Sequence, residues 1–124
     1  MRENFKIRNV SEWLKLSALP VPKIPDENSK GAIYNVLKVG FFLADISDCK
    51  KYGVSDFPIK EGRCPLPTIV VKSEEGEKKF YRLPLGLNEW AHSTVAMVQM
   101  MGQSFFPCNV EFGILNDREY AEML

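Results

Sequence analysis

The clearest helical pattern in the chain covers residues 89–101. Apolar side chains recur there every three or four positions, which predicts an amphipathic helix with a wide buried face. Asn88 is a suitable N-cap before this helix, and Gly102 is a suitable stop after it. We expect the methionines of this helix to fill the core. The expected buried residues are Trp90, Ala91, Thr94, Val95, Met97, Val98 and Met101.

Four segments have the patterns of β-strands. Residues 32–46 are rich in β-branched and aromatic types on both alternating faces, which predicts a long central strand bent at Gly40. A buried helix is the alternative for this run. Residues 68–72 and 78–83 are two β-rich runs joined by charged residues and a glycine, which predicts a hairpin. Residues 109–115 alternate between apolar and polar types, as in a half-exposed strand.

Short elements and loops account for the other residues. Ser11, Ser47 and Asn116 can each cap a short helix, because their side chains accept hydrogen bonds from first-turn amides. The prolines in residues 19–30 lack amide donors, which predicts an extended surface loop or arm. The proline-containing stretch up to Pro67 is also expected to be a loop.

The order of these elements predicts one α+β domain over residues 1–124. A meander of three strands, one helix and a further strand fits a partly open, OB-like barrel. The alternative is an open antiparallel sheet with the 89–101 helix packed across one face and short helices near the termini. A chain of 124 residues can bury one core and is too short for two.

Charge is unevenly distributed along the chain, although the net charge is zero. Residues 1–85 carry 15 Lys and Arg against 11 Asp and Glu, whereas residues 86–124 carry one Arg against five acidic residues. The basic region can bind a polyanion, or the two regions can form complementary surfaces of one fold. The second arrangement is the more common one.

The cellular location is expected to be the cytoplasm. The longest apolar stretch, residues 39–46, contains a glycine and an aspartate and is far shorter than the roughly 20 residues of a membrane span. The first residues carry both charge signs and do not resemble a secretory signal. Three widely spaced cysteines, Cys49, Cys64 and Cys108, are typical of reduced thiols. We expect no membrane segment, no metal and no cofactor.

No enzymatic motif for phosphate, dinucleotide, acyl-transfer or zinc chemistry is present, which favours a protein that is not an enzyme. His92 is the only histidine and would be the default acid–base group, but it falls on the polar face of its helix. Cys49 precedes Lys50 and Lys51, whose charges would lower a thiol pKa. His92 lies near Glu89 on that polar face, where a solvated surface histidine is expected, and Cys49 has no histidine or second cysteine near it in the sequence.

The second run of the hairpin resembles a binding surface. Period-2 alternation places Lys78, Phe80 and Arg82 on one face, so an aromatic ring lies between two cations. Cations that contact phosphates and a ring that stacks on a base suit single-stranded DNA or RNA, and Lys50 and Lys51 could extend this basic surface. Alternatively, one aromatic ring of the strand enters the core and the lysines protect an edge strand.

The sequence therefore favours a non-enzymatic protein that binds single-stranded nucleic acid through this hairpin face. The first alternative is a protein-interaction or assembly subunit, including a homo-oligomer, that uses Phe105 and Phe106 or the methionines of the 89–101 helix. For both of these apolar sets, burial in the core is the favoured interpretation. The second alternative is a small enzyme with a site near His92.

Overall fold

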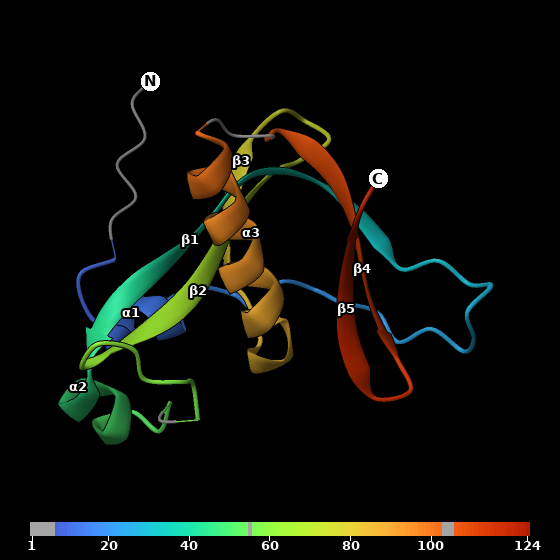
Figure 1. The fold of residues 1–124 in the computed structure, drawn as a ribbon. Coiled ribbons are helices and arrows are strands. Elements are labelled where there is room, and N and C mark those ends of the chain that lie inside the picture. The colour runs from blue at the N-terminus through green and yellow to red at the C-terminus, as the bar shows by residue number, and fades with distance from the viewer. Residues whose placement is uncertain (1–6, 55, 103–105) are drawn as a thin grey trace.

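A computed structural model describes residues 7–54, 56–102 and 106–124 (Figure 1). Five strands form one antiparallel sheet of order β3-β2-β1-β4-β5. The elements are α1 (Val10–Lys15), β1 (Ala32–Asp45), α2 (Ile46–Lys51), β2 (Arg63–Lys72), β3 (Lys78–Arg82), the 3₁₀ helix η1 (Leu85–Leu87), α3 (Asn88–Met101), β4 (Cys108–Leu115) and β5 (Arg118–Met123). The chain is thus a single small α+β domain, and its sheet is not closed.

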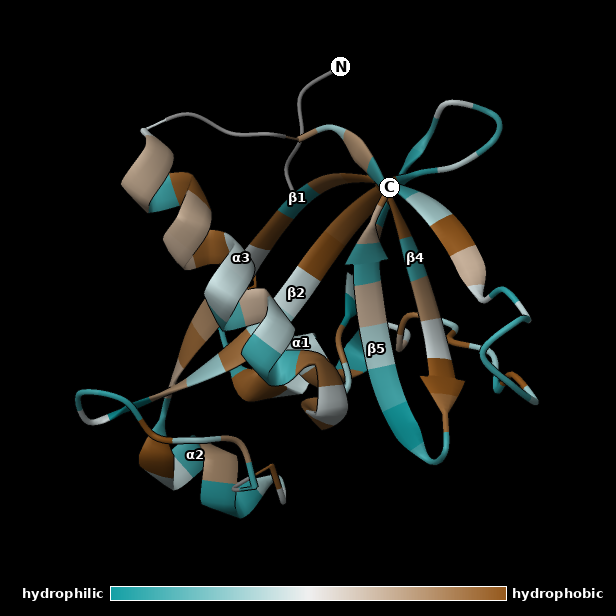
Figure 2. Cartoon of the chain, turned by 45° about the vertical axis from the view of Figure 1, so that its right-hand side comes forward, coloured by the Kyte–Doolittle hydropathy of each residue, from teal (hydrophilic) through white to brown (hydrophobic). Residues whose placement is uncertain are grey.

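The central strand β1 is shared by both halves of the sheet. Its residues 32–36 pair with β4, and its residues 35–45 pair with β2. The register with β2 shifts between Val36 and Lys38, so Leu37 is an extra residue of the kind that bends a strand. The predicted long strand is confirmed, but its irregularity lies at Leu37 rather than at Gly40. Figure 2 shows hydrophobic colours along β1 and β2 and hydrophilic colours along β5 at the sheet edge.

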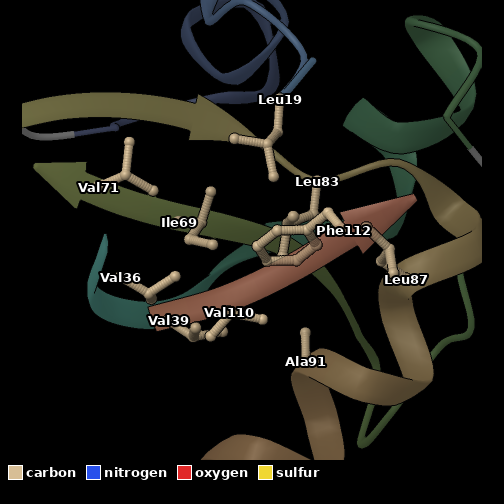
Figure 3. Close-up of a cluster of buried hydrophobic side chains, with 10 residues drawn as sticks. All are labelled: Leu19, Val36, Val39, Ile69, Val71, Leu83, Leu87, Ala91, Val110 and Phe112. Carbon is tan, nitrogen blue, oxygen red and sulfur yellow. The ribbon is translucent and has the colours of Figure 1, made fainter. Parts of the chain in front are cut away.

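The main core lies on one face of the sheet and contains side chains of β1, β2 and β4 (Figure 3). Phe112 of β4 is fully buried there, and its ring meets the rings of Trp90 at 5.4 Å and Tyr34 at 5.9 Å, both edge-on. The helix α3 covers this face, as predicted. The buried residues of this cluster are Leu19, Val36, Val39, Ile69, Val71, Leu83, Leu87, Ala91, Val110 and Phe112.

A second, smaller core lies on the opposite face, where α1 packs against the ends of β1 and β2. Trp13 of α1 is 2% exposed, and its ring meets that of Phe57 edge-on at 5.7 Å. The short helix predicted near Ser11 is confirmed, but Asn9 caps it by accepting from the Glu12 amide at 2.9 Å. The other buried members of this cluster are Val10, Ala44, Cys49, Cys64 and Leu66.

The proline-rich residues 19–30 divide into a docked part and an exposed part. Leu19 is buried in the main core, and it and Ser17 exchange hydrogen bonds of 3.0 Å with the backbone of Arg82 at the end of β3. Ile24 donates to the Ile114 carbonyl of β4 at 2.9 Å. This segment therefore touches both halves of the sheet, while residues 25–28 are exposed.

The methionines of α3 contradict the prediction that they fill the core. Met97, Met100 and Met101 are 49%, 87% and 55% exposed. The helix turns Ala91 and Thr94 toward the sheet, so its buried face is narrower than the apolar pattern predicts. Asn88 is the first helical residue rather than the cap, and Gly102 ends the helix at φ 70° as expected. Phe106 packs against the main core, whereas Phe105 lies outside the described residues.

The C-terminal helix predicted from Asn116 is wrong, because the chain forms a hairpin there. Leu115 pairs with Arg118, and the two residues between them, Asn116 and Asp117, have φ of 52° and 62°. Asn and Asp tolerate this left-handed conformation better than most residues, and two such residues in succession are typical of a tight hairpin turn. The last segment is therefore the edge strand β5.

The predicted hairpin of β2 and β3 is confirmed, but β2 begins in the segment expected to be a loop. Pro65 and Pro67 lie within β2 and pair with β1. β3 pairs only with residues 68–72, so both prolines lie outside the β2–β3 ladder, and the Pro67 carbonyl accepts from the Leu83 amide at 3.1 Å just beyond its end. Within the described part of the chain, no helix has the length and apolarity needed to cross a membrane.

Candidate nucleic-acid interface

The face of β1, β2 and β3 that points away from the main core carries the predicted binding residues. We call it the outer face. Lys78 lies opposite Lys72, Phe80 opposite Val70, and Arg82 opposite Thr68. Their neighbours Lys79 and Tyr81 lie opposite Val71 and Ile69, whose side chains are in the main core. The structure therefore places Lys78, Phe80 and Arg82 on one face, as the alternation predicts.

A groove of about 470 Å³ runs across this outer face. Lys78 and Phe80 of β3 form one wall, and residues of β1 form the other. On β1, Gly40 lies opposite Thr68 and Lys38 lies opposite Val70. The lining residues are Ile7, Leu37, Lys38, Gly40, Phe41, Phe42, Thr68, Val70, Lys78 and Phe80.

The strand positions of this face carry positive charge. Lys38, Lys72 and Lys78 are exposed, and Arg82 is half-buried at the other end of β3 from Lys78. The paired outer positions of β1, β2 and β3 carry no Asp or Glu, whereas the turn between Lys72 and Lys78 carries Glu74, Glu75 and Glu77. Several cations on one sheet face favour binding of a polyanion there, and the glutamates of the turn oppose it at the tip of the hairpin.

Arg82 occupies the predicted face, but its guanidinium already has protein partners. Its Nε donates to the Leu16 carbonyl at 2.8 Å, and the group lies 5.7 Å from the centroid of the Trp13 ring. These contacts join β3 to the C-terminal end of α1. Arg82 therefore holds one end of the groove in place and adds positive charge there.

Lys50 and Lys51 are not brought to the groove. They lie on α2, which follows the point where Asp45 of β1 pairs with Arg63 of β2. Lys78 pairs with the opposite end of β2, so roughly 30 Å of strand separates it from α2 at about 3.3 Å per residue. Only a long strand of nucleic acid could contact both regions.

Lys38, Gly40, Thr68 and Lys72 belong to this face but were not predicted as site residues. A charged residue inside an otherwise apolar strand is a signal that singles out Lys38 in the sequence. The other three acquire a role only from the register of β1, β2 and β3, which the sequence does not reveal; Gly40, for example, pairs with Thr68.

His92 was predicted to be solvated, but its ring is stacked on Phe41. The two ring centroids are 4.2 Å apart and the ring planes differ by 26°. Burial lowers the pKa of His92, and the positive charge of Lys60 acts in the same direction. The ring is therefore neutral at physiological pH and acts as a packing partner of β1.

The free energy of unfolding should decrease as the pH falls from about 7.5 to 5.5. The unfolded chain binds a proton at the ordinary histidine pKa of about 6.5, whereas the folded chain binds it only at lower pH. His92 is the only histidine, so His92→Gln should flatten this dependence. Urea titrations at several pH values measure it, and an equal slope in both proteins would contradict the assignment.

The expectation of a lowered Cys49 pKa is wrong. Burial and the neighbouring Cys64 thiol raise the pKa of Cys49 to about 12. The thiol faces the smaller core, where Cys49 is 2% exposed, whereas Lys50 and Lys51 are exposed to solvent. A thiol with this pKa is a poor nucleophile at neutral pH. Within residues 7–54, 56–102 and 106–124, no three His, Cys, Asp or Glu side chains are grouped to hold a metal ion.

Comparison with known proteins gives no relative. The chain matches no protein-family model, no curated protein and no solved structure.

Proposed function

We propose that this chain binds single-stranded DNA or RNA in the groove of the outer face. The observation that carries the proposal is Phe80 in the wall of a groove, flanked by Lys38 and Lys78. Lysines neutralise phosphates and release counterions, and an aromatic ring such as the half-buried Phe80 offers a stacking surface for a base. In a duplex the faces of the bases are stacked inside the helix, so only a single strand can use such a ring.

We also propose that the sheet binds its ligand in the way that an OB-fold does. OB-folds bind oligonucleotides on the face of their second and third strands, and here β1, β2 and β3 would provide the corresponding surface. We expect the protein to act in the cytoplasm, where its free cysteines stay reduced. Binding would depend on backbone charge and stacking rather than on base sequence.

The test is a fluorescence-anisotropy titration of the purified protein with labelled single-stranded DNA and RNA at two salt concentrations. We expect saturable binding that weakens with salt. Phe80→Ala should lose about 1 to 3 kcal/mol of binding energy, a decrease of roughly 5- to 150-fold in affinity at both salt concentrations. Lys38→Ala should instead decrease the slope of log K against log salt by about 0.7.

Lys79→Ala is the matched control, because Lys79 belongs to the same strand and lies on the other face. Its affinity for a short oligonucleotide should stay within about twofold of the wild type, apart from a small nonspecific charge effect. Equal affinity of the Phe80→Ala protein and the wild type would remove Phe80 from the binding site. Absence of binding by the wild type at low salt would end the proposal.

A second candidate function is protein assembly through α3. The exposed Met97, Met100 and Met101 favour it, because flexible methionine side chains are common at adaptable protein-binding surfaces. Sedimentation velocity over a dilution series, measured on the same preparation before the titration, tests this candidate. A single monomeric species at all concentrations would argue against self-assembly.

A further inference from the structure

The floor of the groove is a glycine that neither the backbone nor the packing requires. Gly40 lies in the middle of β1, and a Cβ built on it would meet only Thr68 Oγ1, at 3.9 Å. By contrast, a Cβ at Gly113 would lie 2.5 Å from the ring of Tyr120. A glycine inside a strand destabilises the fold relative to alanine, because it loses more conformational freedom on folding. The requirements of the fold therefore do not explain why residue 40 is a glycine.

The surroundings of Gly40 form a small depression that is lined by apolar groups, the Thr68 hydroxyl and Lys38. Lys38 and Phe42 precede and follow Gly40 on the same face of β1, and Thr68 lies beside it on β2. The Thr68 hydroxyl can both donate and accept a hydrogen bond. Strand glycines often mark places where a ligand approaches the backbone closely.

We propose that this depression is a subsite for one unpaired nucleobase, an inference that rests on the proposed binding of single-stranded nucleic acid. The edge of the base would face the Gly40 backbone and the Thr68 hydroxyl, and Lys38 would contact an adjacent phosphate. Because a hydroxyl can pair with a donor or an acceptor, the subsite accepts any of the four bases.

The base in this subsite is a different nucleotide from the one that stacks on Phe80. Phe80 lies two strands away from Gly40 and about two residues further along the sheet, which separates the two Cα atoms by about 12 Å. The groove then holds at least two nucleotides of one strand, the first over Gly40 and the second against the Phe80 ring.

The test fills the depression with a side chain. Gly40→Leu should weaken binding of a labelled oligothymidine by about tenfold or more. It should leave the protein folded, because a β-carbon at residue 40 meets no close neighbour and the outer carbons of the leucine would extend into the groove. Gly40→Ala adds only one carbon and should cause a smaller loss of affinity than Gly40→Leu. Oligonucleotides with one abasic position provide the second measurement, because a missing base removes the contact over Gly40 or the stacking contact with Phe80.

Three outcomes separate this inference from the function on which it rests. A folded Gly40→Leu protein that loses affinity, and is less sensitive than the wild type to an abasic position, supports the subsite. Wild-type affinity of a folded Gly40→Leu protein would overturn the subsite, while weakened binding by Phe80→Ala would keep the proposed function intact. A wild-type protein that binds no single strand would overturn both.

Discussion

Replacement of Phe112 by alanine is expected to lower the free energy of unfolding by about 3 to 5 kcal/mol. Phe112 is fully buried and joins three elements, because its ring contacts Tyr34 of β1 and Trp90 of α3 as well as its own strand. Removal of the ring leaves a cavity between the two halves of the sheet that these elements can fill only in part.

Urea unfolding followed by tryptophan fluorescence measures this effect. Small domains have a total stability of about 5 to 15 kcal/mol, so this loss is a large fraction of the stability of the domain. Phe112→Leu is the control, since it keeps most of the apolar volume and should cost clearly less. A loss below about 1 kcal/mol for Phe112→Ala would mean that the main core is not organised around this ring.

The second large effect is expected for Trp13→Ala, also about 3 to 5 kcal/mol. Trp13 is the centre of the smaller core, where its Nε1 donates to the Pro67 carbonyl at 3.2 Å and its ring lies under the Arg82 guanidinium. Loss of this ring would detach α1 from β2 and would remove a contact that positions Arg82 at the end of the groove.

Trp13→Phe separates packing from the hydrogen bond. It keeps a smaller aromatic ring in the smaller core and removes the Nε1 donor, while the Pro67 carbonyl still accepts from the Leu83 amide at 3.1 Å. We therefore expect a loss of about 0.5 to 1.5 kcal/mol from the missing hydrogen bond, plus a contribution from the reduced volume. Thermal unfolding by circular dichroism measures both variants. If the two variants were equally stable, the size of the ring would not be what holds α1 on the sheet.

The elements that were predicted correctly are those with a local signal. The α3 helix and the β2–β3 hairpin have a clear periodicity together with a suitable stop or turn. The C-terminal segment was mistaken for a helix because the same Asn116 signal serves helix caps and tight turns. Pairing of β5 with β4 decides between these structures, and this contact is a property of the fold rather than of residues 116–119.

The sequence predicts which residues of one strand share a face, but it does not predict which residues of neighbouring strands lie beside them. Alternation along β3 is enough to place Lys78 and Phe80 on one face, but the partners Lys38 and Gly40 come from a register that the sequence does not reveal. The pKa of Cys49 likewise depends on a neighbour that the sequence does not reveal. Its neighbours in sequence are lysines, whereas its neighbour in space is the Cys64 thiol, which changes the direction of the pKa shift.

The docked part of the proline-rich segment has a consequence for the order of folding. Ile24 and Ile114 are hydrogen-bonded although 90 residues separate them, and the same segment also bonds to Arg82. Contacts of such long sequence separation slow folding, because a large loop must close before they form. During synthesis, residues 17–24 leave the ribosome well before β4, so Ile24 reaches its native place only after β4 has been made.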